Sequence, residues 1–247
     1  MSALAGFIDL NILAELQTGP EMVHPVVLSD ENHAILVDAG TPGLAEQIIS
    51  AMEEAGVPVS RLNHILLTHA DADHVGSLAK LISLLPRKVE VLCHELEKPY
   101  VQCDVPPLRL SQMEAALGRL NGEQFNKVTA LVQTLKANYK NLAVPVTRTV
   151  EDGEWLPCGA QVIYTPGHTP GHICLYLAEG RTLIAGDLMN ITNGELYPAP
   201  DYFAYDKEAQ KASLRRLTQY DIQTVVCYHG GIYQGEAGKR IKELAEE

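Results

Sequence analysis

The sequence lacks a long apolar run, a cluster of basic residues and a paired cysteine motif. Its apolar stretches fall short of the roughly 18 residues that a membrane span needs, and no basic residue precedes Asp9 and Glu15 near the N-terminus. The five cysteines are scattered without a CxxC pair, which argues against a disulfide framework and against a structural zinc site. We therefore expect a soluble, cytoplasmic protein with no membrane partner.

Charge of positive sign is also scarce. The 247 residues contain 31 acidic and 19 basic side chains, for a formal net charge of -12. Such a chain repels nucleic-acid phosphates, because no local basic patch offsets the excess of carboxylates. Hydrophobic residues make up 46% of the chain, which is enough for one large core. We expect a single domain over residues 1–247 and a small-molecule partner rather than nucleic acid.

Strand and helix patterns alternate along most of the chain. Apolar runs with turn residues between them predict strands at 26–28, 34–37, 64–67, 89–92, 146–150, 161–164, 173–177, 182–185 and 224–228. Helical spacing predicts helices at about 42–55, 78–85 and 207–219, the last of the chain, and a helical insertion or cap at about 99–141. The pattern predicts an α/β fold in which two sheets lie between helix layers.

Metal-binding residue types follow five of these strands. Residues 68–74 (THADADH) place four potential ligands within six positions, and residues 165–172 (TPGHTPGH) repeat a Pro-Gly-His unit. Imidazole and carboxylate groups bind divalent transition metals, and a bridging carboxylate holds two ions about 3.5 to 4 Å apart. If the strand ends converge, two divalent ions would be held by seven residues: His69, Asp71, Asp73, His74, His168, Asp187 and His229.

The order of these motifs, with Asp38-Ala39-Gly40 before them, resembles that of the metallo-β-lactamase fold hydrolases over nearly the whole chain. The resemblance implies an αββα sandwich of two mixed β-sheets flanked by helices, with a dinuclear metal site at one edge. It further implies that Asp38 contacts the metal ligands without binding metal itself. The ligand sets that it implies are His69, Asp71 and His168 for the first ion, Asp73, His74 and His229 for the second, and Asp187 as the bridge.

One position departs from the family pattern. The family loop reads His-x-His-x-Asp-His, whereas here Asp71 replaces the second histidine. Its carboxylate would bind the first ion through oxygen and leave a cluster with no net charge, where the usual ligands leave one positive charge. Zinc is the expected metal. Because a carboxylate is a harder ligand than imidazole, this first site should accept manganese or iron(II) more readily than an all-imidazole site would. The alternative is that Asp71 turns away and the first site is weak or empty.

The chemistry implied is hydrolysis by a bridging hydroxide between the two ions. Asp73 would pass a proton to the leaving group, and Asn190, three residues beyond Asp187, would donate to the developing oxyanion. The expected substrate is a small-molecule ester, lactone or thioester. The alternatives are a phosphodiesterase, a non-catalytic binding module and a redox-active metal site on the same fold.

Other residues are assigned to the surroundings of the site. His172 is expected to position a ligand or structure the turn rather than bind metal; His94 is expected to be structural, with an approach to the rim of the pocket as the alternative. The substrate pocket is expected between the insertion at 99–141 and the loop at 189–205, which carries Tyr197, Tyr202, Phe203 and Tyr205. The apolar stripe of the insertion is compatible with a homodimer.

Overall fold

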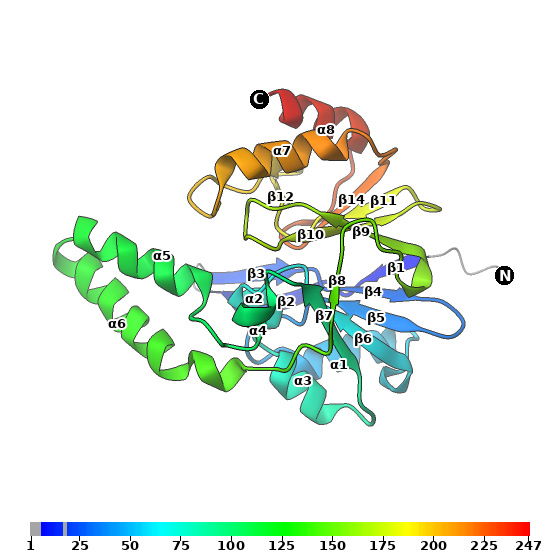
Figure 1. The fold of residues 1–247 in the computed structure, drawn as a ribbon. Coiled ribbons are helices and arrows are strands. Elements are labelled where there is room, and N and C mark those ends of the chain that lie inside the picture. The colour runs from blue at the N-terminus through cyan, green and yellow to red at the C-terminus, as the bar shows by residue number, and fades with distance from the viewer. Residues whose placement is uncertain (1–5, 17–18) are drawn as a thin grey trace.

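The computed structural model describes residues 6–16 and 19–247 and contains four layers, as Figure 1 shows. Two sheets face each other, helices α1 and α3 lie outside the first, and helices α7 and α8 lie outside the second. The αββα class predicted from the sequence is therefore confirmed.

The strands of the first half are β1 (Gly6–Asp9), β2 (Ile12–Leu16), β3 (Gly19–Val23), β4 (Val26–Ser29), β5 (Ala34–Val37), β6 (Leu62–Leu66), β7 (Glu90–His94) and β8 (Arg148–Val150). Those of the second half are β9 (Ala160–Tyr164), β10 (Ile173–Leu177), β11 (Thr182–Ile184), β12 (Met189–Thr192), β13 (Glu195–Pro198), β14 (Thr224–Cys227) and β15 (Gly231–Ile232). The α-helices are α1 (Ala45–Glu54), α2 (Ala72–Val75), α3 (Leu78–Leu84), α4 (Lys98–Val101), α5 (Leu108–Ala116), α6 (Gly122–Asn138), α7 (Lys207–Leu217) and α8 (Ala237–Glu246). Short 3-10 helices are η1 (Val59–Arg61), η2 (Leu117–Arg119), η3 (Tyr139–Leu142) and η4 (Pro157–Gly159).

Both sheets are mixed. The first has the order β1-β4-β5-β6-β7-β8, in which β5 to β8 run parallel to one another and β1, β4 and β5 are antiparallel neighbours. The second has the order β15-β14-β11-β10-β9, in which only β11 and β14 pair in parallel. Because parallel neighbours end at the same edge of a sheet, the loops after β5 and β6 lie together at one edge of the first sheet, and the loops after β11 and β14 lie together at one edge of the second.

Strand alternation divides the apolar side chains between the inner and outer faces of each sheet. In β5, Ala34 and Leu36 pack against the outer helices, whereas Ile35 and Val37 point between the sheets. In β10, Cys174 and Tyr176 pack toward α7 and α8, and the alternate residues face inward. Side chains two residues apart point to the same face of a sheet, so these fully apolar strands pack into a hydrophobic core on each of their two faces.

The predicted helical insertion is present as the segment from α4 to η3. Helices α5 and α6 pack on each other and extend to one side of the sandwich, as Figure 1 shows. Leu110 and Val132 are the buried residues of α5 and α6. No helix in the described part of the chain is both long and apolar enough to cross a membrane.

Two predictions about the C-terminal half were wrong. The segment at 189–205 begins as a hairpin of β12 and β13, turned by Asn193 and Gly194, which both have positive φ. An Asn-Gly pair between two strands is typical of such a turn, so the signal was present in the sequence. The helix at 207–219 is not the last, because α8 follows β15 and buries Ala237, Ile241 and Leu244 on one face.

Candidate metal centre

The fold brings all seven predicted ligands together between the two halves of the sandwich. His69 to His74 follow β6, His168 follows β9, Asp187 follows β11 and His229 follows β14. Their ligand atoms form two groups, each with all its atoms within 4.8 Å of one another. The first group, hereafter cluster 1, contains His69, Asp71 and His168; the second, cluster 2, contains Asp73, His74, Asp187 and His229.

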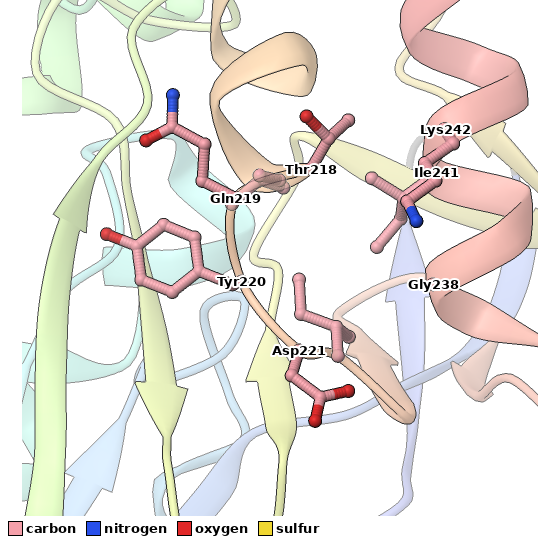
Figure 2. Close-up of a pocket in the computed structure, with 9 residues that line it drawn as sticks. Thr218, Gln219, Tyr220, Asp221, Gly238, Ile241 and Lys242 are labelled. Carbon is pink, nitrogen blue, oxygen red and sulfur yellow. The ribbon is translucent and has the colours of Figure 1, made fainter.

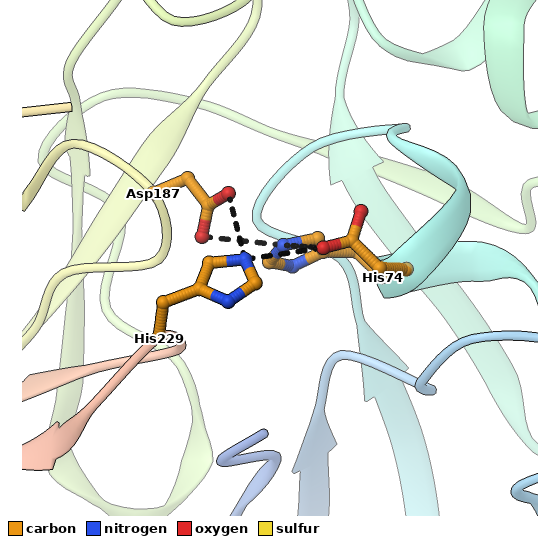
Figure 3. Close-up of side chains that lie close together, drawn as sticks. His74, Asp187 and His229 are labelled. Atoms are coloured by element: carbon orange, nitrogen blue, oxygen red, sulfur yellow. Dashed lines mark hydrogen bonds and ion pairs between the residues drawn. The ribbon is translucent and has the colours of Figure 1, made fainter. Parts of the chain in front are cut away.

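Cluster 2 joins residues from both halves of the chain. Figure 3 shows the Asp187 carboxylate facing the imidazoles of His74 and His229. Asp187 Oδ1 lies 3.3 Å from His74 Nε2, and Asp187 Oδ2 lies 3.5 Å from His229 Nε2. Asp73 Oδ2 lies 3.1 Å from His229 Nε2 and 3.7 Å from His74 Nε2. Two imidazole nitrogens and two carboxylates thus converge on one point.

Cluster 1 lies on the other side of Asp187. Asp71 Oδ2 is 3.5 Å from His69 Nε2 and 3.2 Å from His168 Nε2, so Asp71 does not turn away from its cluster. Asp187 Oδ2 is 3.6 Å from His168 Nε2 and 4.0 Å from His69 Nε2. Asp187 therefore has one oxygen near cluster 2 alone and the other within reach of both clusters, the arrangement that a bridging ligand needs.

The electrostatics of cluster 2 favour a cation. Burial by itself would lower the pKa of His74, but the carboxylates of Asp187, Asp38 and Asp73 raise it well above its usual range. Burial raises the pKa of Asp187, but the imidazoles of His229 and His74 bring it well below the usual carboxyl value. The carboxylates thus create a strong negative potential in a buried site.

Neighbouring residues fix the orientation of the two histidines of cluster 2. Asp38, in the left-handed conformation with φ of 65°, places its Oδ2 3.0 Å from His74 Nδ1 and accepts the Thr68 backbone N–H at 2.9 Å. Glu21 on β3 places its Oε1 2.9 Å from His229 Nδ1. A carboxylate on the far ring nitrogen is the usual way to orient a metal-binding histidine. Asp38 is thus in the position that the resemblance implied, whereas Glu21 carries no sequence signal.

His172 positions Asp187 and is not part of either cluster. Its Nε2 accepts the Asp187 backbone N–H at 3.1 Å, and its Nδ1 lies 2.9 Å from Thr165 Oγ1. Burial lowers the pKa of His172 well below its usual value, which suits an accepting, neutral imidazole. Gly186 has φ of 50°, and a Cβ there would lie 2.8 Å from His172 Nε2. Only glycine therefore allows the turn to approach the imidazole so closely.

Glu97 connects the two ligand loops and was missed by sequence reasoning. Its Oε2 accepts the Ala70 N–H at 2.8 Å, and its Oε1 accepts the Gly171 N–H and the Thr169 hydroxyl, both at 2.7 Å. Ala70 lies between His69 and Asp71, and Thr169 follows His168. Burial raises the pKa of Glu97. One buried carboxyl group thus ties both loops of cluster 1 to the start of the insertion.

Arg109, in the first turn of α5, was also missed. Its Nε donates to Asp71 Oδ2 at 2.7 Å, and its Nη2 lies 2.8 Å from His168 Nε2. The guanidinium carbon lies 5.5 Å from the centre of the Phe203 ring. An arginine 38 positions beyond Asp71, inside a helical insertion, has no motif that would reveal it. The insertion thus supplies a positive charge to cluster 1.

Other predicted residues lie outside both clusters. Asn190 is on β12, and the N–H of the next residue, Ile191, donates to the His229 carbonyl. The Oδ1 atom of Asn190 is buried without a hydrogen-bond partner among the described residues. His94 stacks on Tyr164 with ring centres 4.4 Å apart. Tyr197 lies beneath the Arg240 guanidinium, at 5.9 Å.

A pocket of about 310 Å³ lies between the end of α7 and α8, as Figure 2 shows. It is lined by Leu217, Thr218, Gln219, Tyr220, Asp221, Ile222, Gly238, Ile241 and Lys242. None of these residues belongs to either cluster, so the pocket is not the predicted substrate site.

The residues of cluster 2 fit a divalent ion. His74 Nε2 and Asp187 Oδ1 are buried and have no hydrogen-bond partner among the described residues, although they face each other across 3.3 Å. Unpartnered buried ligand atoms in a carboxylate-rich site are accounted for by an ion between them. Cluster 1 also has one such atom, His69 Nε2, but it fits an ion less well, because Arg109 contacts the ligand atoms of Asp71 and His168.

The chain also matches the sequence pattern of the metallo-beta-lactamase superfamily over residues 18–229. It therefore belongs to this superfamily. The match includes strands of both sheets, all but β1 and β15, and ends at His229, the last ligand of cluster 2.

Similar proteins include metallo-hydrolases. The chain is 31% identical over 225 residues to the probable metallo-hydrolase YflN of Bacillus subtilis (strain 168), an alignment that covers 84% of this chain and 80% of that protein. It is 28% identical over 216 residues to a hydroxyacylglutathione hydrolase of Cereibacter sphaeroides, covering 84% of this chain and 65% of that protein. Its fold is similar to that of TTHA1429, a metallo-beta-lactamase family protein from Thermus thermophilus, with a TM-score of 0.71 at 21% identity, covering 99% and 80% of the two chains.

Proposed function

We propose that this protein is a metal-dependent hydrolase that cleaves a small-molecule ester, lactone or thioester. The observation that carries the proposal is cluster 2, in which two imidazoles and two carboxylates converge with unpartnered ligand atoms. A binding module has no need of so complete a set of ligands at the edge of two sheets. The relatives named as metallo-hydrolases support the same class of reaction.

The residues of cluster 2 would hold the ion, and Asp187 would join the two clusters. When bound, such an ion polarises a carbonyl group and activates water. Asp73 is the carboxylate of cluster 2 with the most solvent access, at 25% side-chain exposure against 11% for Asp187. We therefore assign Asp73 the transfer of a proton to the leaving group. Asn190 remains the proposed oxyanion donor, on the strength of its place three residues after Asp187.

Aromatic side chains beside the clusters suit a substrate with an apolar portion. Tyr202, Phe203 and Tyr205 are exposed by 76%, 41% and 56%, on the segment that follows β13. This segment is tied to cluster 1, because the Tyr205 N–H donates to the His168 carbonyl at 3.2 Å and Arg109 donates to the Phe203 carbonyl. Exposed aromatics next to a polar reaction site are typical of ligand-binding walls.

The test is turnover against metal content. Protein purified without added metal is analysed for bound elements, stripped with a chelator, and reloaded with Zn²⁺, Mn²⁺ or Fe²⁺. It is assayed with p-nitrophenyl esters, lactones and an acylglutathione thioester, because one relative is named for that bond, and with a phosphodiester as the competing class. We expect chelator-sensitive cleavage of the carboxylic substrates, restored by zinc. Absence of turnover of every substrate by the reloaded protein would contradict the proposal.

A further inference from the structure

Arg109 occupies the side of cluster 1 where a first ion would bind. Its Nε donates to Asp71 Oδ2 at 2.7 Å, and its Nη2 lies 2.7 Å from the same oxygen and 2.8 Å from His168 Nε2. Arginine has only N–H donors, so the contact with His168 requires Nε2 of that ring to accept through its lone pair. An ion held by His168 would need the same lone pair.

The guanidinium is held in this place by more than the two ligands. Its Nη1 donates to Gln112 Oε1 at 2.9 Å and to the Phe203 carbonyl at 2.5 Å, so each of its three nitrogens has a partner. The Arg109 side chain is only 21% exposed. Both the insertion and the aromatic segment at 202–205 therefore hold Arg109 at cluster 1. A fully bonded guanidinium is a resident cation and not a free anchor for a substrate anion.

The charges of cluster 1 match this role. A carboxylate at position 71 adds one negative charge to a buried site, and Arg109 adds one positive charge in direct contact with it. A buried carboxylate is stable only when a cation or hydrogen-bond donors compensate it. No lysine or arginine among the described residues contacts cluster 2, whose ligand atoms face one another and, through Asp187 Oδ2, His69 and His168.

We propose that Arg109 is a built-in cation of cluster 1 that competes with a divalent ion for Asp71 and His168. The chain then binds one divalent ion tightly, at cluster 2, and a second ion at least about tenfold more weakly, since Arg109 must first withdraw. This inference rests on the proposed function only for the ion of cluster 2. Because Arg109 lies on α5, the helical insertion would then determine how many ions the protein binds tightly.

The test compares Arg109→Met with the wild type and with Arg119→Met. Methionine removes the guanidinium but keeps a flexible apolar side chain, and Arg119 is an exposed arginine of the same insertion. Zinc stoichiometry is measured by elemental analysis after dialysis, and zinc affinity by calorimetric titration of the chelator-treated proteins. We expect one tightly bound ion in the wild type and in Arg119→Met, and two in Arg109→Met, with the second step strengthened at least about tenfold.

Two tightly bound ions in the wild type, or an unchanged second step in Arg109→Met, would overturn the inference and leave the hydrolase proposal standing. Absence of any bound ion in all three proteins would overturn both. If Arg109→Met does not fold, Asp71→Asn is measured in its place. That variant removes a ligand of cluster 1 as well as the partner of Arg109, so Arg109→Gln, which removes only the positive charge, is measured beside it; an unchanged second zinc-binding step in Arg109→Gln would overturn the inference.

Discussion

Replacing Glu97 by glutamine should lower the stability of the metal-free protein and its affinity for a divalent ion. The Glu97 carboxyl group is almost fully buried and accepts three hydrogen bonds, from Ala70, Thr169 and Gly171. Glutamine offers one acceptor oxygen and one donor amide at the same two positions. At least one buried N–H or O–H group must then face another donor.

The magnitude follows from that lost bond. A buried donor left without a partner costs about 2 kcal/mol. For a chain of this length, each kcal/mol shifts the melting temperature by about 2 to 4 °C, so we expect a decrease of about 4 to 8 °C. The loops that move carry His69, Asp71 and His168. The weaker, second zinc-binding step, at cluster 1, should therefore lose about tenfold in affinity, which is the lower end of the effect of groups that orient ligands.

The assay is thermal unfolding of the chelator-treated protein followed by zinc titration. Glu95→Gln is the matched control, because it makes the same change at an exposed position two residues earlier. The assignment of Glu97 as the connection between the two loops would be refuted if Glu97→Gln had the same melting temperature and the same zinc affinity as the wild type and Glu95→Gln.

Three further predictions concern the clusters and the scaffold. Asp187→Ala should weaken divalent-ion binding by more than about 100-fold, since it removes a ligand rather than a supporting group; zinc titration would show this, and unchanged affinity would exclude Asp187 as a ligand. Gly167→Ala should destabilise the protein by about 3 kcal/mol in urea unfolding, because φ is 139° and a Cβ there would lie 2.4 Å from the Gln210 backbone. Gly118→Ala, with open space around it, is the control and should be nearly neutral. Partial burial raises the pKa of Asp30, but three backbone N–H groups lower it to about 2, so its stabilisation is present above about pH 4 and is lost as the pH falls toward 2. The stability difference between wild type and Asp30→Asn should shrink over that range, and a constant difference would contradict the assignment.

Local signals predicted most of the sandwich. Strands β5 and β10 were predicted with their observed bounds, and α3 to within a residue, because their apolar periodicity and flanking turn residues agree with their place in the fold. The Asn193-Gly194 turn and the apolar stripe of α8 are equally clear in the sequence, but neither the hairpin nor this helix was predicted. The helical insertion was predicted as a unit, because the chain changes there from strand-forming to helix-forming residues.

The ligands were predictable for a similar reason. Each follows a predicted strand, and the order of the motifs resembles that of the superfamily, so His69, Asp71, Asp73 and His74 could be associated with Asp187 and His229 without coordinates. The supporting groups were not predictable in this way. Glu21, Glu97 and Arg109 lie in a hairpin, a loop and a helix whose sequences carry no motif, and each reaches its partner only across the tertiary fold.

The sequence by itself determined the αββα class, the insertion and the seven candidate ligands, because these depend on periodicity and on residues at the ends of strands. The resemblance had also implied how the ligands divide into two sets, and only the tertiary structure decided which other side chains surround each cluster. It placed a guanidinium from α5 against Asp71 and His168, whereas no lysine or arginine within the described part of the chain contacts cluster 2. The physical reason is distance along the chain: 38 residues separate Arg109 from Asp71, and only packing of the insertion against the sandwich brings their charges into contact.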